Sequence, residues 1–354
     1  MEENKERVSE SKLGGFRDKY FSEGLLWFCR IFVGLLFTIS GLIKVNDITG
    51  FAYKLEDYFN VFENDFGLPA HWFASWAILQ SALISIFEVA VAITLLIGFW
   101  PRLTAGLLLG MIIFFTFLTG YSWLLERVQD CGCFGDALKL TPFQSFMKDV
   151  VLTVLIGYIY RYRGEIKPLM PPKLNASTAA IATLLTTFIT YYCYAHLPII
   201  DFRPACVGCN LKENVTEKEV EEGVFEAKLK SYSPMQNDCQ VDEFKGNTLL
   251  FIIPKLHKLG DEEIKNLIQL YQAVKNDVQV LAGVSASPTS KVQEYKQKYN
   301  IPFCMSLQDE TMLKTMIRSN PGFILLKDGI VIGQWHYNDI PSRETILKTL
   351  DKSK

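Results

Sequence analysis

The pattern of apolar and polar positions divides the chain into two parts. Long, nearly uncharged apolar runs recur through the first 195 residues, whereas shorter apolar runs alternate with amphipathic stretches from Asn247 onward. A helix needs roughly 20 mostly apolar residues to cross a bilayer. Five segments approach this composition and are predicted to be membrane-spanning helices: residues 26–45, 74–99, 103–125, 146–160 and 176–195. The fourth is the shortest, and Lys148 and Asp149 lie near its start.

The charges between these runs predict an orientation. Lys and Arg residues gather before the first run and between the fourth and fifth runs, whereas the loop between the first two runs is acidic on balance. Because Lys and Arg favour the cytoplasmic side, residues 1–24 are predicted to be a cytoplasmic segment of a multi-pass protein in a bacterial inner membrane. Five spans would place the C-terminal part in the periplasm. The polar start does not resemble a cleavable signal, so the first run is expected to stay as an anchor.

The C-terminal part, residues 247–354, has the alternation of a mixed α/β domain. Residues 248–253 form an apolar β-run, residues 261–275 show helical spacing, and the order ends with two strands and a helix. The break Lys327-Asp328-Gly329 is typical of a hairpin turn between the last two strands.

This order of elements, together with Ser319-Asn320-Pro321-Gly322, resembles a thioredoxin-like domain. The resemblance implies that Pro321 is the cis-proline that opens a central strand. It also implies a Cys-x-x-Cys motif after the first strand, where this chain has Pro254-Lys255-Leu256-His257 instead. We therefore expect this domain to bind or position a substrate and not to exchange disulfides by the usual route.

Two cysteine pairs follow apolar runs on the predicted outer side, where disulfides persist. Cys131 and Cys133 are separated by one glycine, and Cys206 and Cys209 form a Cys-x-x-Cys motif. A disulfide between cysteines one residue apart closes a small, strained ring, which would be easily reduced. Both pairs are candidates for dithiol exchange, and structural disulfides are the alternative. Four thiols also fit the ligand count of a zinc site, but an oxidising compartment opposes it, and no metal is expected.

Several charged residues lie in or next to the apolar runs. Glu88 is in the middle of the second run, where an unpaired charge is costly. Lys44 ends the first run, and Asp136, Lys148 and Asp149 follow the first cysteine pair. One interpretation makes these groups the polar wall of a quinone or proton site. The other has the lysines extending to the membrane surface and Asp149 paired with one of them.

Three sequence segments in the membrane part resemble the DoxX/MauE family of small four-helix membrane proteins. They are the stretch Ser40-Gly41-Leu42-Ile43-Lys44, the second run with Glu88 and Leu96-Ile97-Gly98, and the loop Asp130-Cys131-Gly132-Cys133-Phe134-Gly135-Asp136. The resemblance covers residues 26–160 and implies a four-helix membrane domain over residues 25–165. A fifth membrane helix (174–196), an outer Cys-x-x-Cys segment with a linker (197–246) and the thioredoxin-like domain would be additions. MauE is the methylamine-utilisation member, linked to disulfide formation, and DoxX relatives are linked to electron transfer to quinone.

These features favour an integral membrane thiol-disulfide relay. It would pass electrons from a periplasmic thiol protein or a small thiol, through Cys206/Cys209 and Cys131/Cys133, to a quinone. A non-catalytic assembly protein with structural disulfides is the alternative, and a small transporter using Glu88 as a proton site is a third hypothesis. Contact with membrane lipid is expected in each case. The net charge of -2 and the lack of a basic patch argue against nucleic-acid binding.

Overall fold

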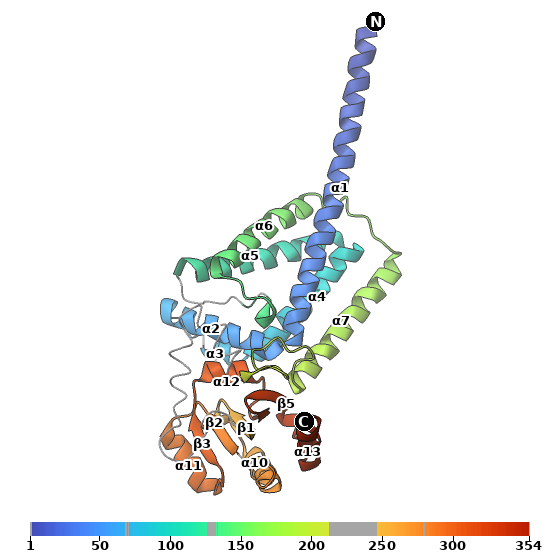
Figure 1. The fold of residues 1–354 in the computed structure, drawn as a ribbon. Coiled ribbons are helices and arrows are strands. Elements are labelled where there is room, and N and C mark those ends of the chain that lie inside the picture. The colour runs from blue at the N-terminus through green and yellow to red at the C-terminus, as the bar shows by residue number, and fades with distance from the viewer. Residues whose placement is uncertain are drawn as a thin grey trace. The chain divides into compact units, whose positions relative to one another are not determined.

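The computed structural model describes residues 2–67, 69, 71–125, 132, 134–211, 246–278 and 280–353. The chain forms two compact units, Met1–Tyr191 (unit 1) and Tyr192–Lys354 (unit 2), which are considered separately below (Figure 1).

Unit 1 is helical. Its elements are α1 (Glu2–Asn46), α2 (Ile48–Phe66), α3 (His71–Ala74), α4 (Ala77–Ile97), α5 (Pro101–Leu125), the short 3-10 helix η1 (Gly135–Ala137), α6 (Pro142–Arg161) and α7 (Pro172–Ala195). Among the described residues, four helices are long and apolar enough to cross a membrane: Glu23–Asn46 within α1, then α4, α5 and α7. The chain is therefore a multi-pass membrane protein.

The prediction of five apolar spans is confirmed for four of them. The remaining segment, 146–160, is helical as part of α6, but α6 is not among the candidate spans. Its sequence explains why, since Lys148, Asp149 and Arg161 lie within 20 residues. Helix α6 begins at a capping box, in which the Thr141 side chain and the Gln144 side chain each bond the other residue's backbone N–H.

Helices α1 and α4 pack side by side, as do α5 and α6 (Figure 1). The core between them is made of apolar side chains that include Val33, Phe37, Leu95, Leu108, Ile112, Ile156 and Ile159. Glycine lets the backbones of α1 and α4 come close, because a Cβ on Gly41 would lie 2.6 Å from Cγ2 of Val89. Small residues at such contacts are typical of helix packing in membranes, where close van der Waals contact drives association.

A buried arginine ties α1 to the end of α4. Arg30 is only 2% exposed. Its Nε donates to the carbonyl of Leu95 at 2.8 Å, and its Nη2 donates to that of Leu96 at 2.8 Å. Its Nη1 donates to the carbonyl of Lys167 at 3.0 Å. The last carbonyls of a helix have no partner within it. The guanidinium supplies a donor for the carbonyl of Leu96 and a second donor for that of Leu95, which also accepts the N–H of Gly98.

The amphipathic helix α2 follows α1 directly and packs on α4. The side chain of Asp47 accepts the backbone N–H of Gly50 and caps its start. Helix α2 buries Phe51, Leu55 and Tyr58, and the hydroxyl of Tyr58 shares a 2.8 Å hydrogen bond with Ser122 of α5. A helix that sequence reasoning treated as an acidic loop therefore forms part of the helical core.

Unit 2 contains a five-stranded mixed sheet in the order β3-β2-β1-β4-β5. The strands are β1 (Asn247–Ile253), β2 (Val280–Ser285), β3 (Cys304–Leu307), β4 (Gly322–Lys327) and β5 (Ile330–His336). Strand β1 is parallel to β2 and antiparallel to β4, β3 is parallel to β2, and β4 and β5 form the predicted hairpin. The helices are α10 (Asp261–Val274), α11 (Thr289–Tyr299), α12 (Glu310–Met316) and α13 (Arg343–Lys352), with the 3-10 turns η2 (Leu256–Lys258) and η3 (Tyr337–Asp339).

Each face of this sheet has its own core, because successive residues of β1 point to opposite sides. Leu249 and Phe251 pack with side chains of α10 and α13. Leu250 and Ile252 pack with side chains of α12 on the other face. The Asn320–Pro321 peptide bond is cis, the geometry predicted for this proline. The prediction of helical membrane segments followed by a thioredoxin-like α/β domain is thus confirmed.

Replacing Arg30 with methionine tests the tie between α1 and α4. Arg30→Met leaves three carbonyl acceptors without their charged donor, and we expect a loss of about 3 kcal/mol of stability. Thermal unfolding of the detergent-solubilised protein measures it. Arg102→Met, at an exposed position of α5, is the control and should leave the melting temperature unchanged. Equal melting temperatures for the two variants would contradict the assignment.

Candidate redox and membrane sites

The Cys206–Cys209 pair is a disulfide, and the Cα atoms of the two residues are 5.3 Å apart. Backbone hydrogen bonds attach this segment to strand β5. The N–H of Gly208 donates to the carbonyl of Val331 at 2.7 Å, and the N–H of Val331 donates to that of Cys209 at 2.9 Å. An antiparallel bridge joins Asn210 to Ile330. The disulfide segment therefore covers the outer edge of β5, as edge strands in native proteins commonly require.

Apolar anchors on both sides of the disulfide fix its position. Ala205 and Leu211 are buried in the core on the α12 face of the sheet. Both cysteines, by contrast, are partly exposed, and Val207 between them is 60% exposed. The disulfide is thus held at the surface by buried residues before and after it. Ala205 and Leu211, at the two ends of this segment, therefore pack with the sheet of unit 2.

Arg203 is a further anchor for this segment, and it is only 3% exposed. Its guanidinium forms a two-point ion pair with Asp201, with both N–O distances 2.7 Å. It also donates to Oε1 of Gln334 on β5 at 2.7 Å and to the carbonyl of Met316 at 3.1 Å. Gln334 in turn donates to the carbonyl of Ala205. Because these groups occupy the guanidinium, Arg203 positions the disulfide segment.

The strand register places the disulfide and the cis-proline at opposite ends of β4 and β5. Gly322, next to Pro321, pairs with His336 at the end of β5. The disulfide segment bonds Val331, which is five residues earlier and therefore about 17 Å away along the strand. Pro321 consequently does not face the Cys206–Cys209 disulfide. The usual thioredoxin arrangement, with the cis-proline beside the redox pair, is absent from this part of the described chain.

Asn320, the residue next to Pro321, instead bonds the backbone of Lys255 with its side chain. The side chain of Asn320 accepts the N–H of Lys255 at 3.1 Å and donates to the carbonyl of Lys255 at 3.0 Å. Lys255 also forms a 3.3 Å ion pair with Glu310, which Lys314 approaches to 2.9 Å. Burial favours a higher pKa for Glu310, but the hydrogen bond and charge of Lys314, with the charge of Lys255, hold it below its usual value. Lys255, which bonds Asn320, therefore belongs to a network of three charged side chains.

Cys131 and Cys133 lie outside the described residues, as does the rest of residues 126–131. Gly132, between the two cysteines, is described, and it is buried with a φ of 67°. A Cβ at Gly132 would lie 3.0 Å from Cγ of Lys54, so α2 contacts the glycine of this motif. Further along the same loop, the ring of Phe134 lies 5.4 Å from the ammonium of Lys148. A helix before this loop and a helix after it therefore contact its described residues.

The predicted charged residues are brought together in two places. Lys44 and Glu88 form a 2.5 Å ion pair between α1 and α4, and their side chains are 3% and 2% exposed. Lys44 also donates to the hydroxyl of Ser40 at 3.1 Å. Lys44 is therefore buried and does not extend to the membrane surface.

Asp149 forms the second polar centre, between α5 and α6. It pairs with Lys148 at 2.7 Å and accepts a 3.0 Å hydrogen bond from Thr119. Asp149 is buried, whereas the side chain of Lys148 is 21% exposed. Asp136 lies in η1, and the adjacent Gly135 approaches Ile43 of α1. The pairing of Asp149 with Lys148 matches the second interpretation drawn from the sequence.

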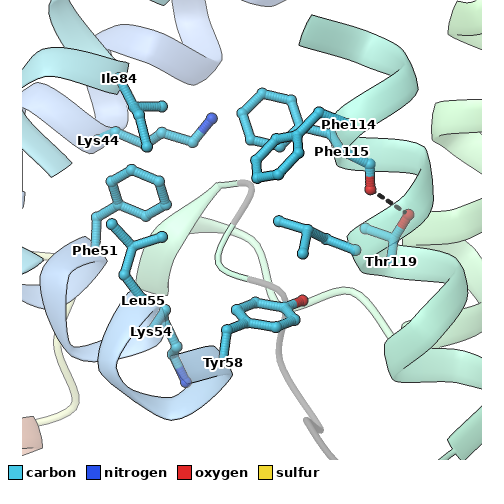
Figure 2. A pocket seen from close by; sticks show the side chains of 10 residues that line it. Lys44, Phe51, Lys54, Leu55, Tyr58, Ile84, Phe114, Phe115 and Thr119 are labelled. Atoms are coloured by element: carbon cyan, nitrogen blue, oxygen red, sulfur yellow. Dashed lines mark hydrogen bonds between the residues drawn. The ribbon is translucent and has the colours of Figure 1, made fainter. Parts of the chain in front are cut away.

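A pocket lies beside Lys44, between α1, α2, α4 and α5 (Figure 2). It is lined by Lys44, Phe51, Lys54, Leu55, Tyr58, Ile84, Phe114, Phe115, Leu118 and Thr119. The free volume is about 20 Å³, enough for about one water molecule. Sequence reasoning found Lys44 but missed the residues from α2. The sequence pattern that could have identified the residues of α2 is the apolar face formed by Phe51, Leu55 and Tyr58 within an otherwise acidic stretch.

A zinc site built from all four thiols would require the Cys206–Cys209 pair to be reduced. A disulfide offers no thiolate ligand, so Cys206 and Cys209 are not available to a metal. Within the described ranges, no group of three or more His, Cys, Asp or Glu side chains has the arrangement of a metal site.

Comparison with known proteins agrees with the membrane architecture. Residues 22–161 match the family described as "Methylamine utilisation protein MauE". The chain is also similar to "Protein TlpB" of Flavobacterium psychrophilum, with 26% identity over 152 residues. That match covers 40% of this chain and 38% of the relative, so well under half of the relative's length is matched.

The chain is thus a multi-pass membrane protein whose residues 22–161 are similar to the MauE family, and a C-terminal thioredoxin-like domain follows them. The matched range contains the membrane part of α1 and helices α2 to α6, together with the loop that carries Cys131 and Cys133. Helix α7 and unit 2 lie beyond it. The DoxX part of the predicted resemblance stays a prediction.

Replacing Arg203 with methionine tests its role as an anchor. Arg203→Met removes a buried cation and leaves the carboxylate of Asp201 and the Oε1 of Gln334 without this donor. We expect unit 2 to lose about 3 kcal/mol of stability. Chemical denaturation followed by circular dichroism measures this loss. Reduction of Cys206–Cys209 by dithiothreitol should also become faster, since the segment detaches from β5.

The matched control is Arg343→Met, which removes the cation of an ion pair with Asp277 that lies at the surface. Exposed ion pairs contribute little to stability because water screens them, so Arg343→Met should change neither quantity appreciably. An Arg203 variant indistinguishable from this control would show that the segment is held by other contacts.

Proposed function

We propose that the protein is an integral membrane thiol-disulfide relay. Cys206/Cys209 exchanges with a thiol protein or a small thiol in the periplasm, and Cys131/Cys133 accepts the electrons from Cys206/Cys209. A quinone in the membrane is the final acceptor. The observation that carries the proposal is the partly exposed Cys206–Cys209 disulfide, held at the surface of unit 2 by Arg203 and two buried anchors.

The form of this disulfide supports exchange with a large partner. Reactive groups commonly lie on loops positioned by a rigid scaffold, and the strand-like bonds to β5 supply such a scaffold. The exposed Val207 and Gly208 leave the loop accessible from outside. An attacking thiolate needs this access to reach a sulfur.

The described neighbours of Cys131 and Cys133 support a second redox centre at the helical bundle. Gly132 contacts Lys54, which also lines the pocket of Figure 2. A lysine near a thiol lowers its pKa and favours the thiolate, which is the reactive form. The match to the MauE family covers this loop and supports its assignment as part of the membrane domain.

The electrons and protons balance across the relay. An external dithiol reduces the Cys206–Cys209 disulfide and becomes a disulfide itself. The resulting dithiol reduces a Cys131–Cys133 disulfide through a mixed disulfide between the pairs. The Cys131/Cys133 dithiol then gives two electrons and two protons to a quinone, which becomes the quinol. Each step transfers the same two electrons, and the net reaction is dithiol plus quinone to disulfide plus quinol.

The relay requires both pairs on one side of the membrane, which we propose is the periplasmic side of the inner membrane. This orientation requires α6 to cross as a fifth span. Its 20 residues extend about 30 Å, the thickness of a bilayer core. The pairing of Asp149 with Lys148 and Thr119 reduces the cost of placing its charges there.

One observation favours a second candidate function, that of a non-catalytic assembly protein. The disulfide segment completes the edge of a sheet, so the Cys206–Cys209 bond could serve only to brace that edge. The two functions differ in how readily the disulfide is reduced. A bracing disulfide resists reduction by thiol buffers, whereas an exchanging one responds to them.

A redox titration of the full chain in lipid nanodiscs tests the relay. The protein is equilibrated in glutathione and dithiothreitol buffers, free thiols are alkylated, and each cysteine is read by mass spectrometry. The relay predicts that both pairs titrate reversibly at potentials above about -300 mV, the range of exchanging disulfides. Pairs that stay oxidised at lower potentials would support the bracing function.

Cysteine variants make this test specific. Cys206→Ser and Cys131→Ser should each abolish dithiol-dependent quinone reduction, because each breaks the chain of exchange. Cys29→Ala removes a buried thiol outside both pairs and should leave turnover within about twofold of the unsubstituted protein, because this thiol takes no part in the relay. Turnover that survives both serine changes would refute the relay.

A further inference from the structure

The Lys44–Glu88 ion pair is an unusual element of the membrane domain. Both side chains are almost fully buried, and taking two charges out of water costs several kcal/mol for each ion. Apolar residues of similar volume often give equal or greater stability in such positions. The packing of α1 on α4 has other sources, in Gly41 and Arg30. Helix packing alone therefore does not explain the Lys44–Glu88 ion pair.

Two aromatic rings and two hydrogen-bond acceptors surround the ammonium of Lys44. The ammonium lies 5.5 Å from the ring centre of Phe51 and 5.0 Å from that of Phe115. Glu88 and Ser40 accept two of its hydrogens. In Figure 2 the nitrogen points into the pocket, toward Phe115. The third hydrogen is thus directed into a space with aromatic walls.

The pocket lies next to an exposed side chain of α5 and next to the residue that contacts Gly132. Phe114 lines it and is 50% exposed on the outer surface of α5. Lys54 lines it as well and contacts Gly132. The free volume of about 20 Å³ is too small for a ring. A ring therefore enters only after side chains that line the pocket move, and Phe114 is the most exposed of them.

We propose that this pocket binds the head group of a lipid-soluble quinone, with Lys44 donating a hydrogen bond to one carbonyl oxygen and Glu88 holding Lys44 in place. The assignment rests on the proposed relay, for which it supplies the acceptor site. A quinone fits three features together: a planar ring between Phe51 and Phe115, a carbonyl acceptor for Lys44, and an apolar tail that leaves toward lipid past Phe114.

The charge of Lys44 also suits the reaction. As two electrons pass from the Cys131/Cys133 dithiol to the quinone, negative charge develops on the carbonyl oxygens. A preorganised cation in a site shielded from water stabilises such charge strongly. Lys44 transfers a proton to one oxygen and regains one of the two protons released by the dithiol. The second proton goes to the other oxygen, so Lys44 ends the cycle unchanged.

The test measures quinone binding separately from thiol exchange. Decylubiquinone and menadione are titrated into the full chain in nanodiscs, and quenching of tryptophan fluorescence gives Kd after correction with empty nanodiscs. The double variant Lys44→Met/Glu88→Leu removes both charges together, so that no unpaired ion is left behind. We expect Kd to rise about tenfold to a hundredfold, the loss of one hydrogen bond from a charged donor.

A matched pair of aromatic substitutions serves as the second test. Phe115→Leu alters the pocket wall, whereas Phe117→Leu alters an exposed residue of the same helix that is not among the pocket residues. Only the first should weaken quinone binding. An unchanged Kd in both Phe115→Leu and the double variant would overturn the site. The absence of saturable quenching in the unsubstituted protein would also overturn the site.

The redox titration of the cysteines distinguishes failure of this site from failure of the relay. If both pairs titrate reversibly but quinone binding does not depend on Lys44, the relay stands and this site is wrong. If quinone binds and depends on Lys44 while the cysteines resist reduction, the site stands as a quinone-binding pocket and the relay is wrong.

Discussion

The pairing of buried charges is the constraint on which the membrane domain depends. A charge held among apolar helices must find its partners within the protein, because no water is present to solvate it. Arg30 meets this need at one end of α4, and Lys44 meets it through Glu88 further along the same contact between α1 and α4. These two residues of α1 are 14 positions apart, about 21 Å along a helix. Helix α1 is thus fixed to α4 at two levels.

Unit 2 has a constraint of its own, because an edge strand presents unpaired backbone N–H and C=O groups that native proteins cover. Strand β5 is covered by the segment that carries Cys206 and Cys209. Ala205 and Leu211 are inserted into the core, and only the loop between them is exposed. One segment therefore protects the sheet and presents a disulfide. The position beside Pro321, where thioredoxin-like domains usually carry their cysteines, is occupied by the bonds between Asn320 and Lys255.

The sequence predicts the features that depend on local pattern. Apolar length identifies α1, α4, α5 and α7, and alternation identifies the strands and the hairpin of unit 2. The contacts that build the sites depend on helix rotation and on distant partners, which no local pattern specifies. Lys44 and Glu88 are 44 residues apart, and Arg203 and Gln334 are 131 apart. The role of α2 was missed because acidic residues on its outer face concealed an apolar face.

The central claim is that the two cysteine pairs exchange with each other, and trapping of a mixed disulfide tests it most directly. Cys209→Ser and Cys131→Ser, combined in one chain, leave Cys206 and Cys133 without their partners. The account predicts a bond between Cys206 and Cys133, found by mass spectrometry of the digested protein and lost on reduction. A chain in which both cysteines remain separate thiols under oxidising conditions, while the protein stays folded, would contradict it.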